Sequence, residues 1–73
     1  MLKMGKYQHF KGNYYQVLHL AKHSENEEYM VVYQPLYDNK EGIRDIWVRP
    51  LNMFDEVIER EGIKLKRFSF IEE

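Results

Sequence analysis

Pro50 divides the sequence into two kinds of pattern. Before it, short runs of β-branched and aromatic residues alternate with polar turns, which is typical of antiparallel strands. After it, apolar residues recur four positions apart within residues 53–58, which is typical of a helix. Because proline disfavours a helical conformation in the residue before it, Arg49 is predicted to end a strand and Asn52 to cap a short helix. The chain is therefore predicted to be mostly β, with one helix late in the sequence.

Five strands can be placed between the predicted turns. They are expected over residues 5–10, 14–23, 28–34, 43–49 and 63–71. The pair Gly12 and Asn13 suits a two-residue hairpin turn between the first two strands, which would place Phe10 opposite Tyr15. Pro35 removes a backbone donor at the end of the third strand, so pairing is expected to weaken there.

The region around Gly62 completes the predicted topology. Gly62 suits the C-terminal cap of a helix of two to three turns, and the alternation of the last strand changes phase near Arg67, which predicts a bulge. Five strands in meander order, with the first and last adjoining, predict a small SH3-like five-stranded antiparallel barrel with one short helix before the last strand. The alternative is an open antiparallel sheet with the helix laid on one face.

Size and composition favour one small domain over residues 1–73. The chain has 73 residues, 44% of them hydrophobic and 15% aromatic, so aromatic side chains are expected to carry the core. It has no cysteine, which excludes a disulfide framework. A net charge of −1 argues against binding nucleic acid through bulk charge. No apolar run is long enough to cross a membrane, so a cytoplasmic protein with no membrane partner is predicted.

The two faces of the predicted sheet differ in polarity. The core face is expected to hold Leu18, Leu20, Val31, Tyr33, Ile46 and Val48. The opposite face would hold Val17, His19, Ala21, Met30, Val32, Gln34, Asp45, Trp47 and Arg49. Trp47 is either covered by the helix as a second small core, or lies in a binding groove beside Gln34 and Arg49. In a groove it would stack on a base, a peptide or a cation.

The histidines do not favour a metal site. His19 and His23 share a strand face but stand about 13 Å apart, at roughly 3.3 Å per residue, too far to bind one zinc ion. No metal and no cofactor is predicted. The run His23, Ser24 and Glu25 has the composition of a catalytic set, but neighbouring side chains point in different directions, so their convergence is not expected.

Basic residues gather where the first and last strands are predicted to adjoin. They are Lys6, Lys11, Lys64, Lys66 and Arg67, interleaved with aromatic residues. Phosphates and stacked bases would suit such a patch. The alternative is edge protection, because lysines on exposed strand edges discourage aggregation between sheets.

Several motifs together resemble a known family. They are residues 7–12, 15–18, 21–25, 31–33, 36–37 and 47–54. Occurring in this order from about Gly5 to Phe68, they resemble the small bacterial domain of unknown function 1653 family. The resemblance implies a small bacterial or phage-type intracellular protein and carries no established activity. It draws attention to His9, Lys11, His23, Ser24, Glu25, Trp47, Arg49 and Pro50.

The sequence therefore predicts a small non-catalytic binding module that recognises a protein, peptide or nucleic-acid partner through an aromatic and basic face. The candidate binding residues are His9, Lys11, His23, Ser24, Glu25, Gln34, Trp47 and Arg49. A second set, for nucleic acid, is Lys6, Lys64, Lys66 and Arg67. No catalytic residue is assigned; the alternative is a small hydrolase or ligand-modifying enzyme that uses residues 23–25. A monomer or a weak homodimer is expected.

Overall fold

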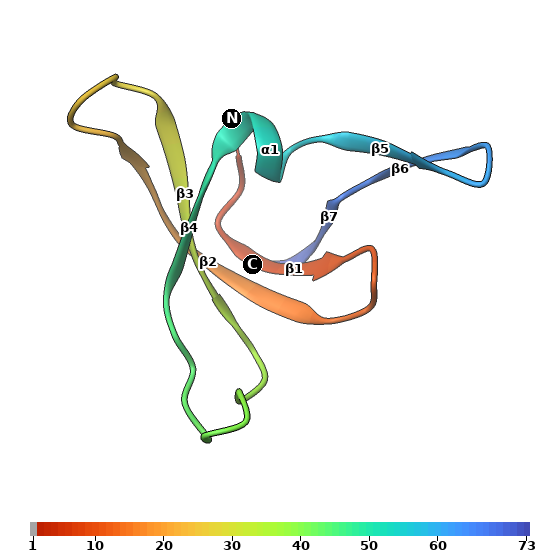
Figure 1. Cartoon of the computed structure of the whole chain (residues 1–73), viewed down its shortest axis with the longest axis horizontal. Coiled ribbons are helices and arrows are strands. Elements are labelled where there is room, and N and C mark those ends of the chain that lie inside the picture. Colours follow the sequence, from red (N-terminus) through yellow and green to blue (C-terminus); the bar gives the residue numbers. More distant parts are fainter. Residues whose placement is uncertain (1) are drawn as a thin grey trace.

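The computed structural model describes residues 2–73, which form seven strands and one short helix (Figure 1). The elements in chain order are β1 (Gly5–His9), β2 (Tyr14–Lys22), β3 (Tyr29–Pro35), β4 (Trp47–Pro50), α1 (Leu51–Phe54), β5 (Val57–Arg60), β6 (Ile63–Lys66) and β7 (Phe68–Glu72). Five strands form one antiparallel sheet in the order β4-β3-β2-β1-β7, whereas β5 and β6 form a separate hairpin. The prediction of a mostly β, antiparallel fold is confirmed.

The sheet is open, so the predicted closed SH3-like barrel is not found. Its edge strands are β4 and β7, and no strand within residues 2–73 pairs with their outer sides. The predicted adjacency of the first and last strands is confirmed, because β1 pairs with β7 and places His9 opposite Phe68. In Figure 1 the β5–β6 hairpin projects away from the sheet.

The helix is shorter than the sequence pattern predicts. It covers only Leu51–Phe54 and is preceded by Pro50 as its N-cap residue, so the predicted cap at Asn52 was wrong. Glu61 and Gly62 have φ values of 52° and 79° and join β5 to β6 as a two-residue hairpin turn. The positive φ of Gly62 therefore serves a hairpin and does not end a helix.

The predicted last strand is two strands. The phase change near Arg67 is not a bulge, because Arg67 separates β6, which pairs with β5, from β7, which pairs with β1. The first hairpin also differs from the prediction, since Tyr15 lies opposite Tyr7 and not opposite Phe10. Residues 10–12 form a longer turn there, closed by the His9 N–H, which donates to the Asn13 carbonyl at 2.8 Å.

The pairing of β2 with β3 contains an irregularity that exchanges faces. Leu20 lies opposite Val31, as predicted, but Val17 and not Leu18 lies opposite Tyr33, because the register shifts between Val17 and His19. A bulge of this kind inserts one residue and reverses the facing beyond it. Val17, predicted on the outer face, is consequently buried with 2% of its surface exposed.

The pairing of β3 with β4 also differs by one residue from the prediction. Trp47 and not Ile46 lies opposite Tyr33, and the ladder ends before Pro35. Pro35 has no N–H to offer to a partner, and pairing is lost there on the β4 side only. On the β2 side Pro35 lies opposite Tyr15, and the Leu36 N–H donates to the Tyr14 carbonyl at 2.9 Å, so the predicted weakening holds for one of the two neighbouring strands. Beyond the ladder, the Gln34 side-chain amide donates to the Arg44 carbonyl at 3.0 Å, which holds the approach to β4 beside β3.

The core is small and mostly aromatic. It consists of Tyr7, Val17, Val31, Tyr33, Phe54 and Phe68. Phe54, the one core residue from α1, packs against three rings of the sheet, with centroid separations of 5.3 Å to Tyr7, 5.4 Å to Tyr33 and 4.1 Å to Phe68. The face of the sheet on which α1 lies is called the inner face below.

Candidate functional site

The helix α1 covers only one end of the inner face. Side chains alternate along a strand, so His9 shares the face of Tyr7, and Tyr15 shares the face of Val17. Trp47 lies opposite Tyr33 and is also on the inner face. The rings that contact Phe54 are those of Tyr7, Tyr33 and Phe68. His9, Tyr15 and Trp47 are not among them. We name His9, Tyr15, Tyr37, Trp47 and Arg49 the open face.

His9 lies on the open face beside Tyr15, with ring centroids 6.3 Å apart. Its ring packs edge-on against Phe68 with centroids 4.9 Å apart, and its Nδ1 accepts the backbone N–H of Lys11 at 3.1 Å. The pKa of His9 is lowered from 6.5, first by burial and then by the positive charges of Arg49, Arg67 and Lys11. A neutral imidazole with Nδ1 occupied leaves Nε2 as the ring nitrogen available to a ligand.

Arg49 brings a positive charge to the same place. Its guanidinium carbon lies 5.4 Å from the ring centroid of Phe68, which is a cation–π contact. The ion pairs within residues 2–73 are Arg44 with Asp38, Lys66 with Asp55, and Arg67 with Glu56. Arg49 takes part in none of them, so its planar set of donors remains available for an anion.

Aromatic rings supply the flat part of the open face. Trp47 is 53% exposed although it lies opposite the buried Tyr33. The Tyr15 and Tyr37 hydroxyls form a hydrogen bond of 3.0 Å, and Tyr37 is 42% exposed. Burial, followed by the bond to Tyr37, raises the pKa of Tyr15 to about 12, so this phenol is neutral at physiological pH.

Two further candidate residues lie around this face. Lys11 is exposed in the turn beside His9, and its ammonium group lies 5.9 Å from the ring centroid of Phe10. Gln34 lies on the other side of the sheet, because it alternates with Tyr33, and its amide is bonded to the Arg44 carbonyl. The structure thus places Lys11 near the open face and Gln34 away from it.

The run His23, Ser24 and Glu25 lies at the opposite end of β2 from Tyr15. All three residues are exposed in the turn between β2 and β3. His23 Nδ1 accepts the backbone N–H of Glu25 at 3.1 Å, and the His23 N–H donates to the Glu28 carbonyl at 2.8 Å. The contact between His23 and Glu25 therefore shapes the turn and does not join imidazole to carboxylate.

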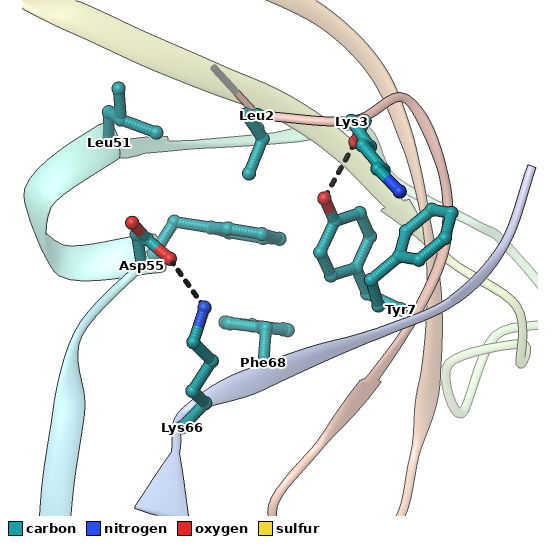
Figure 2. Close-up of a pocket in the computed structure, with 9 residues that line it drawn as sticks. Leu2, Lys3, Tyr7, Leu51, Asp55, Lys66 and Phe68 are labelled. Atoms are coloured by element: carbon teal, nitrogen blue, oxygen red, sulfur yellow. Dashed lines mark hydrogen bonds and ion pairs between the residues drawn. The ribbon is translucent and has the colours of Figure 1, made fainter.

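The second basic set is dispersed. Lys66 pairs with Asp55 at 3.3 Å (Figure 2), and Arg67 donates twice to one oxygen of Glu56, at 2.9 and 3.1 Å. Lys6 lies on the outer face, since it alternates with Tyr7, and its ammonium group lies over the ring of Tyr14. Lys64 is exposed on the projecting hairpin. These four side chains do not form one surface.

A cavity of about 440 Å³ lies between the N-terminal segment, α1 and β7 (Figure 2). Its lining residues include Leu2, Leu51 and Phe68. Two polar pairs in its walls are already bonded: the Tyr7 hydroxyl donates to the Lys3 carbonyl at 2.7 Å, and Lys66 is paired with Asp55. The Lys3 ammonium group lies 5.0 Å from the ring centroid of Phe70. The cavity thus has one cation without an ion pair in residues 2–73, whereas the open face combines such a cation with an exposed indole and an imidazole.

Two sequence expectations concern absences. Across residues 2–73, no three histidine or acidic side chains lie close enough together to hold a metal ion. The described part of the chain also has no helix that is long and apolar enough to cross a membrane.

The sequence analysis missed part of the open face. Tyr15 was placed only in a hairpin pair, and Tyr37 and Phe68 were not among the candidate residues. The ring of Phe68 contacts both His9 and Arg49. Phe68 lies in β7, about twenty residues along the chain from Arg49 and almost sixty from His9. A pairing of β1 with β7 was the available signal for Phe68, whereas Tyr37 was indicated only by the family motif at residues 36–37.

The fold and the open face define a small, mostly β protein built on one open antiparallel sheet. The chain belongs to the family described as "Protein of unknown function (DUF1653)", which matches residues 5–70, and the predicted resemblance is confirmed. It is similar to a DUF1653 protein of known crystal structure from Bordetella bronchiseptica. The two are 31% identical, with a TM-score of 0.85, over 96% of this chain and 87% of that one. No curated protein matches the chain.

Proposed function

We propose that this protein is a non-catalytic binding module and that its open face recognises single-stranded nucleic acid. The observation that carries the proposal is the combination at one surface of an exposed indole and an arginine that forms no ion pair within residues 2–73 of its own chain. Trp47 and Arg49 are two residues apart on one strand, so both project from the inner face about 7 Å apart along the strand. Successive bases and phosphates present flat and anionic groups at a comparable spacing.

The chemistry of each group fits this role. Stacking of a base on an aromatic side chain contributes about 1–3 kcal/mol and needs no particular base. The fork of donors on Arg49 matches phosphate oxygens, and His9 Nε2 lies within the same positive surroundings. Because the whole chain carries a net charge of −1, attraction has to come from this local cluster and not from bulk charge.

The packing and the solvent exposure of the open face favour binding over catalysis. Arg49 and His9 both pack on Phe68, which is only 3% exposed, so their contacts are with a buried ring of the core. Their ligand-facing sides lie on an open sheet, where water has free access. Such a surface suits recognition, whereas catalysis generally depends on excluding water from the reacting groups.

The test is fluorescence anisotropy of a labelled oligothymidine of about twelve nucleotides, a length within the range bound by small single-strand modules. The unmodified chain is expected to bind, with affinity that falls steeply as salt rises. Arg49→Ala and Trp47→Ala are each expected to weaken binding about tenfold, which corresponds to roughly 1.4 kcal/mol. Arg44→Ala is the matched control, since Arg44 is an exposed arginine already paired with Asp38.

Three results would count against this function. Absence of binding at low salt would reject it, as would equal losses in Arg49→Ala and Arg44→Ala. A salt-insensitive complex would also reject a phosphate contact. If extended peptides bind at Trp47 and Arg49 and oligonucleotides do not, the face belongs to a protein partner.

A further inference from the structure

The outer edge of β4 is an exposed strand edge that is only partly protected. No strand in the part of the chain that the structure describes pairs with this side of β4. Ile46, Trp47 and Val48 are 60%, 53% and 61% exposed. Natural edge strands are usually protected by lysines, prolines, inward charges or bulges; β4 has Arg49 on its inner face and Pro50 at its end, but residues 45–48 contain neither lysine nor proline. An exposed apolar edge of this kind is a template for pairing with another strand.

The sequence of this edge is complementary to itself. If two copies pair antiparallel about a two-fold axis at Trp47, each residue lies opposite the one at equal distance on the other side of that tryptophan. Asp45 then lies opposite Arg49 of the second copy, and Ile46 lies opposite Val48. Opposite charges and matched apolar side chains are the cross-strand pairs that stabilise a sheet.

The local structure is compatible with this pairing. The paired edge must begin two residues before β4, at Asp45. On the β3 side of this segment Pro35 has no N–H, so it cannot donate a hydrogen bond to Asp45. The hydrogen bond from Gln34 to the Arg44 carbonyl nevertheless keeps this segment beside β3. Asp45 is exposed and takes part in none of the ion pairs formed within residues 2–73.

We propose that the chain forms a homodimer by antiparallel pairing of β4 with β4 of a second copy, centred on Trp47. The reciprocal pairs of Asp45 with Arg49 fix the register, because a shift by one residue would put Asp45 opposite Val48 or Pro50 and Arg49 opposite Arg44 or Ile46. To form these pairs the Arg49 guanidinium turns from the ring of Phe68 toward the edge of β4. The product is a continuous ten-stranded sheet in which the two open faces adjoin on the same side. A contact along one short strand buries less than a standard interface, so the dimer dissociates on dilution.

The experiment is sedimentation equilibrium of the full chain, without nucleic acid, over a series of protein concentrations. The unmodified chain is expected to shift from monomer to dimer as concentration rises. Asp45→Arg places arginine opposite Arg49, and Arg49→Asp places aspartate opposite Asp45, so each like-charge contact occurs twice in the dimer. Each single reversal is expected to raise the dissociation constant about tenfold or more.

The double variant Asp45→Arg with Arg49→Asp restores opposite charges in the dimer and is expected to restore dimerisation. It cannot do so within one chain, because residues four apart on a strand are separated by about 13 Å. Glu41→Arg is the matched control, since Glu41 is exposed and the change in charge equals that of Asp45→Arg. Circular dichroism confirms that each variant is folded.

Three outcomes would overturn the proposed dimer. They are a monomer at the highest soluble concentration, a dimer that Asp45→Arg leaves unchanged, or single losses that the double variant does not repair. If Arg49→Asp fails to fold, Asp45→Arg decides the question against the Glu41→Arg control. Because the sedimentation experiment contains no oligonucleotide, a failure to dimerise does not reject the proposed binding of nucleic acid, which the anisotropy assay tests.

Discussion

The rings of Phe54 and Phe68 lie parallel, with centroids 4.1 Å apart and an angle of 5° between their planes. This stack joins α1 to β7, two elements separated in sequence by the β5–β6 hairpin. Tyr7 and Tyr33 meet the ring of Phe54 edge-on, so one side chain of a four-residue helix contacts three strands of the sheet. The attachment of α1 therefore depends largely on Phe54.

Replacing Phe54 is expected to be the most damaging single truncation. Phe54 is 1% exposed, so Phe54→Ala should lower the free energy of unfolding by about 3–5 kcal/mol, a large fraction of the stability of so small a domain. Urea denaturation followed by circular dichroism measures the loss. Met53→Ala is the control, because Met53 is the neighbouring residue in α1 and is 50% exposed. Similar losses in the two variants would refute the central role of Phe54.

Gly5 and Gly12 are expected to respond differently to alanine. Both have positive φ, 132° and 109°, but a Cβ on Gly5 would collide with the backbone carbonyl of Glu72, whereas one on Gly12 would meet open space. Backbone strain alone costs about 1–3 kcal/mol, so both variants should lose stability and Gly5→Ala should lose more. Thermal unfolding gives the comparison. A larger loss in Gly12→Ala would show that β7 yields to accommodate a side chain at Gly5.

The titration of His9 is expected to make the fold less stable in mild acid. Burial, with the nearby positive charges of Arg49, Arg67 and Lys11, lowers its pKa in the folded protein below 6.5. The unfolded chain therefore binds the proton first as the pH falls. The contribution of neutral His9 is fully present above pH 6.5 and is lost as the pH falls through the folded pKa.

Urea denaturation from about pH 7.5 down to about pH 5 tests this linkage in the unmodified chain and in His9→Gln. The variant should lose less stability over that range, because its side chain does not titrate. Proton NMR of the His9 ring should give a midpoint below 6.5. Parallel stability curves for the two proteins would contradict the linkage.

The ion pair between Arg67 and Glu56 is expected to contribute more than its neighbour. Arg67 and Glu56 side chains are 28% and 42% exposed and share two hydrogen bonds, so Arg67→Ala should cost about 1 kcal/mol. Lys66 and Asp55 are 56% and 57% exposed and form one longer contact, so Lys66→Ala should cost close to nothing. Chemical denaturation at low salt resolves the difference. Equal losses would mean that the partial burial of Arg67 adds nothing.

The structure could be predicted from the sequence where a residue type permits only a few backbone conformations or hydrogen bonds. Pro35 has no N–H, which is visible in the sequence, and the pairing of β3 with β4 ends before it, although Pro35 still pairs with Tyr15 of β2. The adjacency of the first and last strands also followed from their meander order. That Trp47 and Arg49 share one face was predictable in the same way, since they are two apart in a strand.

The sequence was insufficient where two structures satisfy the same local pattern. Gly62 with positive φ suits both the end of a helix and a hairpin turn, and the β-branched Val57 and Ile58 were the available signal for the strand. The bulge beside Leu18 has no local signature. It reversed the predicted facing of Val17, and an independent error of one residue in the next loop did the same for Trp47.

The way the β5–β6 hairpin joins the sheet determines which segment can change in length or sequence without disturbing the rest of the fold. The Arg67 N–H donates to the Glu56 carbonyl at 2.9 Å, so the residues at which the hairpin leaves and returns are already bonded to each other. Apart from the approach of Arg60 to Phe10 and the ion pair of Lys66 with Asp55, residues 57–66 pair mainly among themselves. Insertions, deletions or a grafted recognition loop in this segment would therefore leave β7 in place on β1.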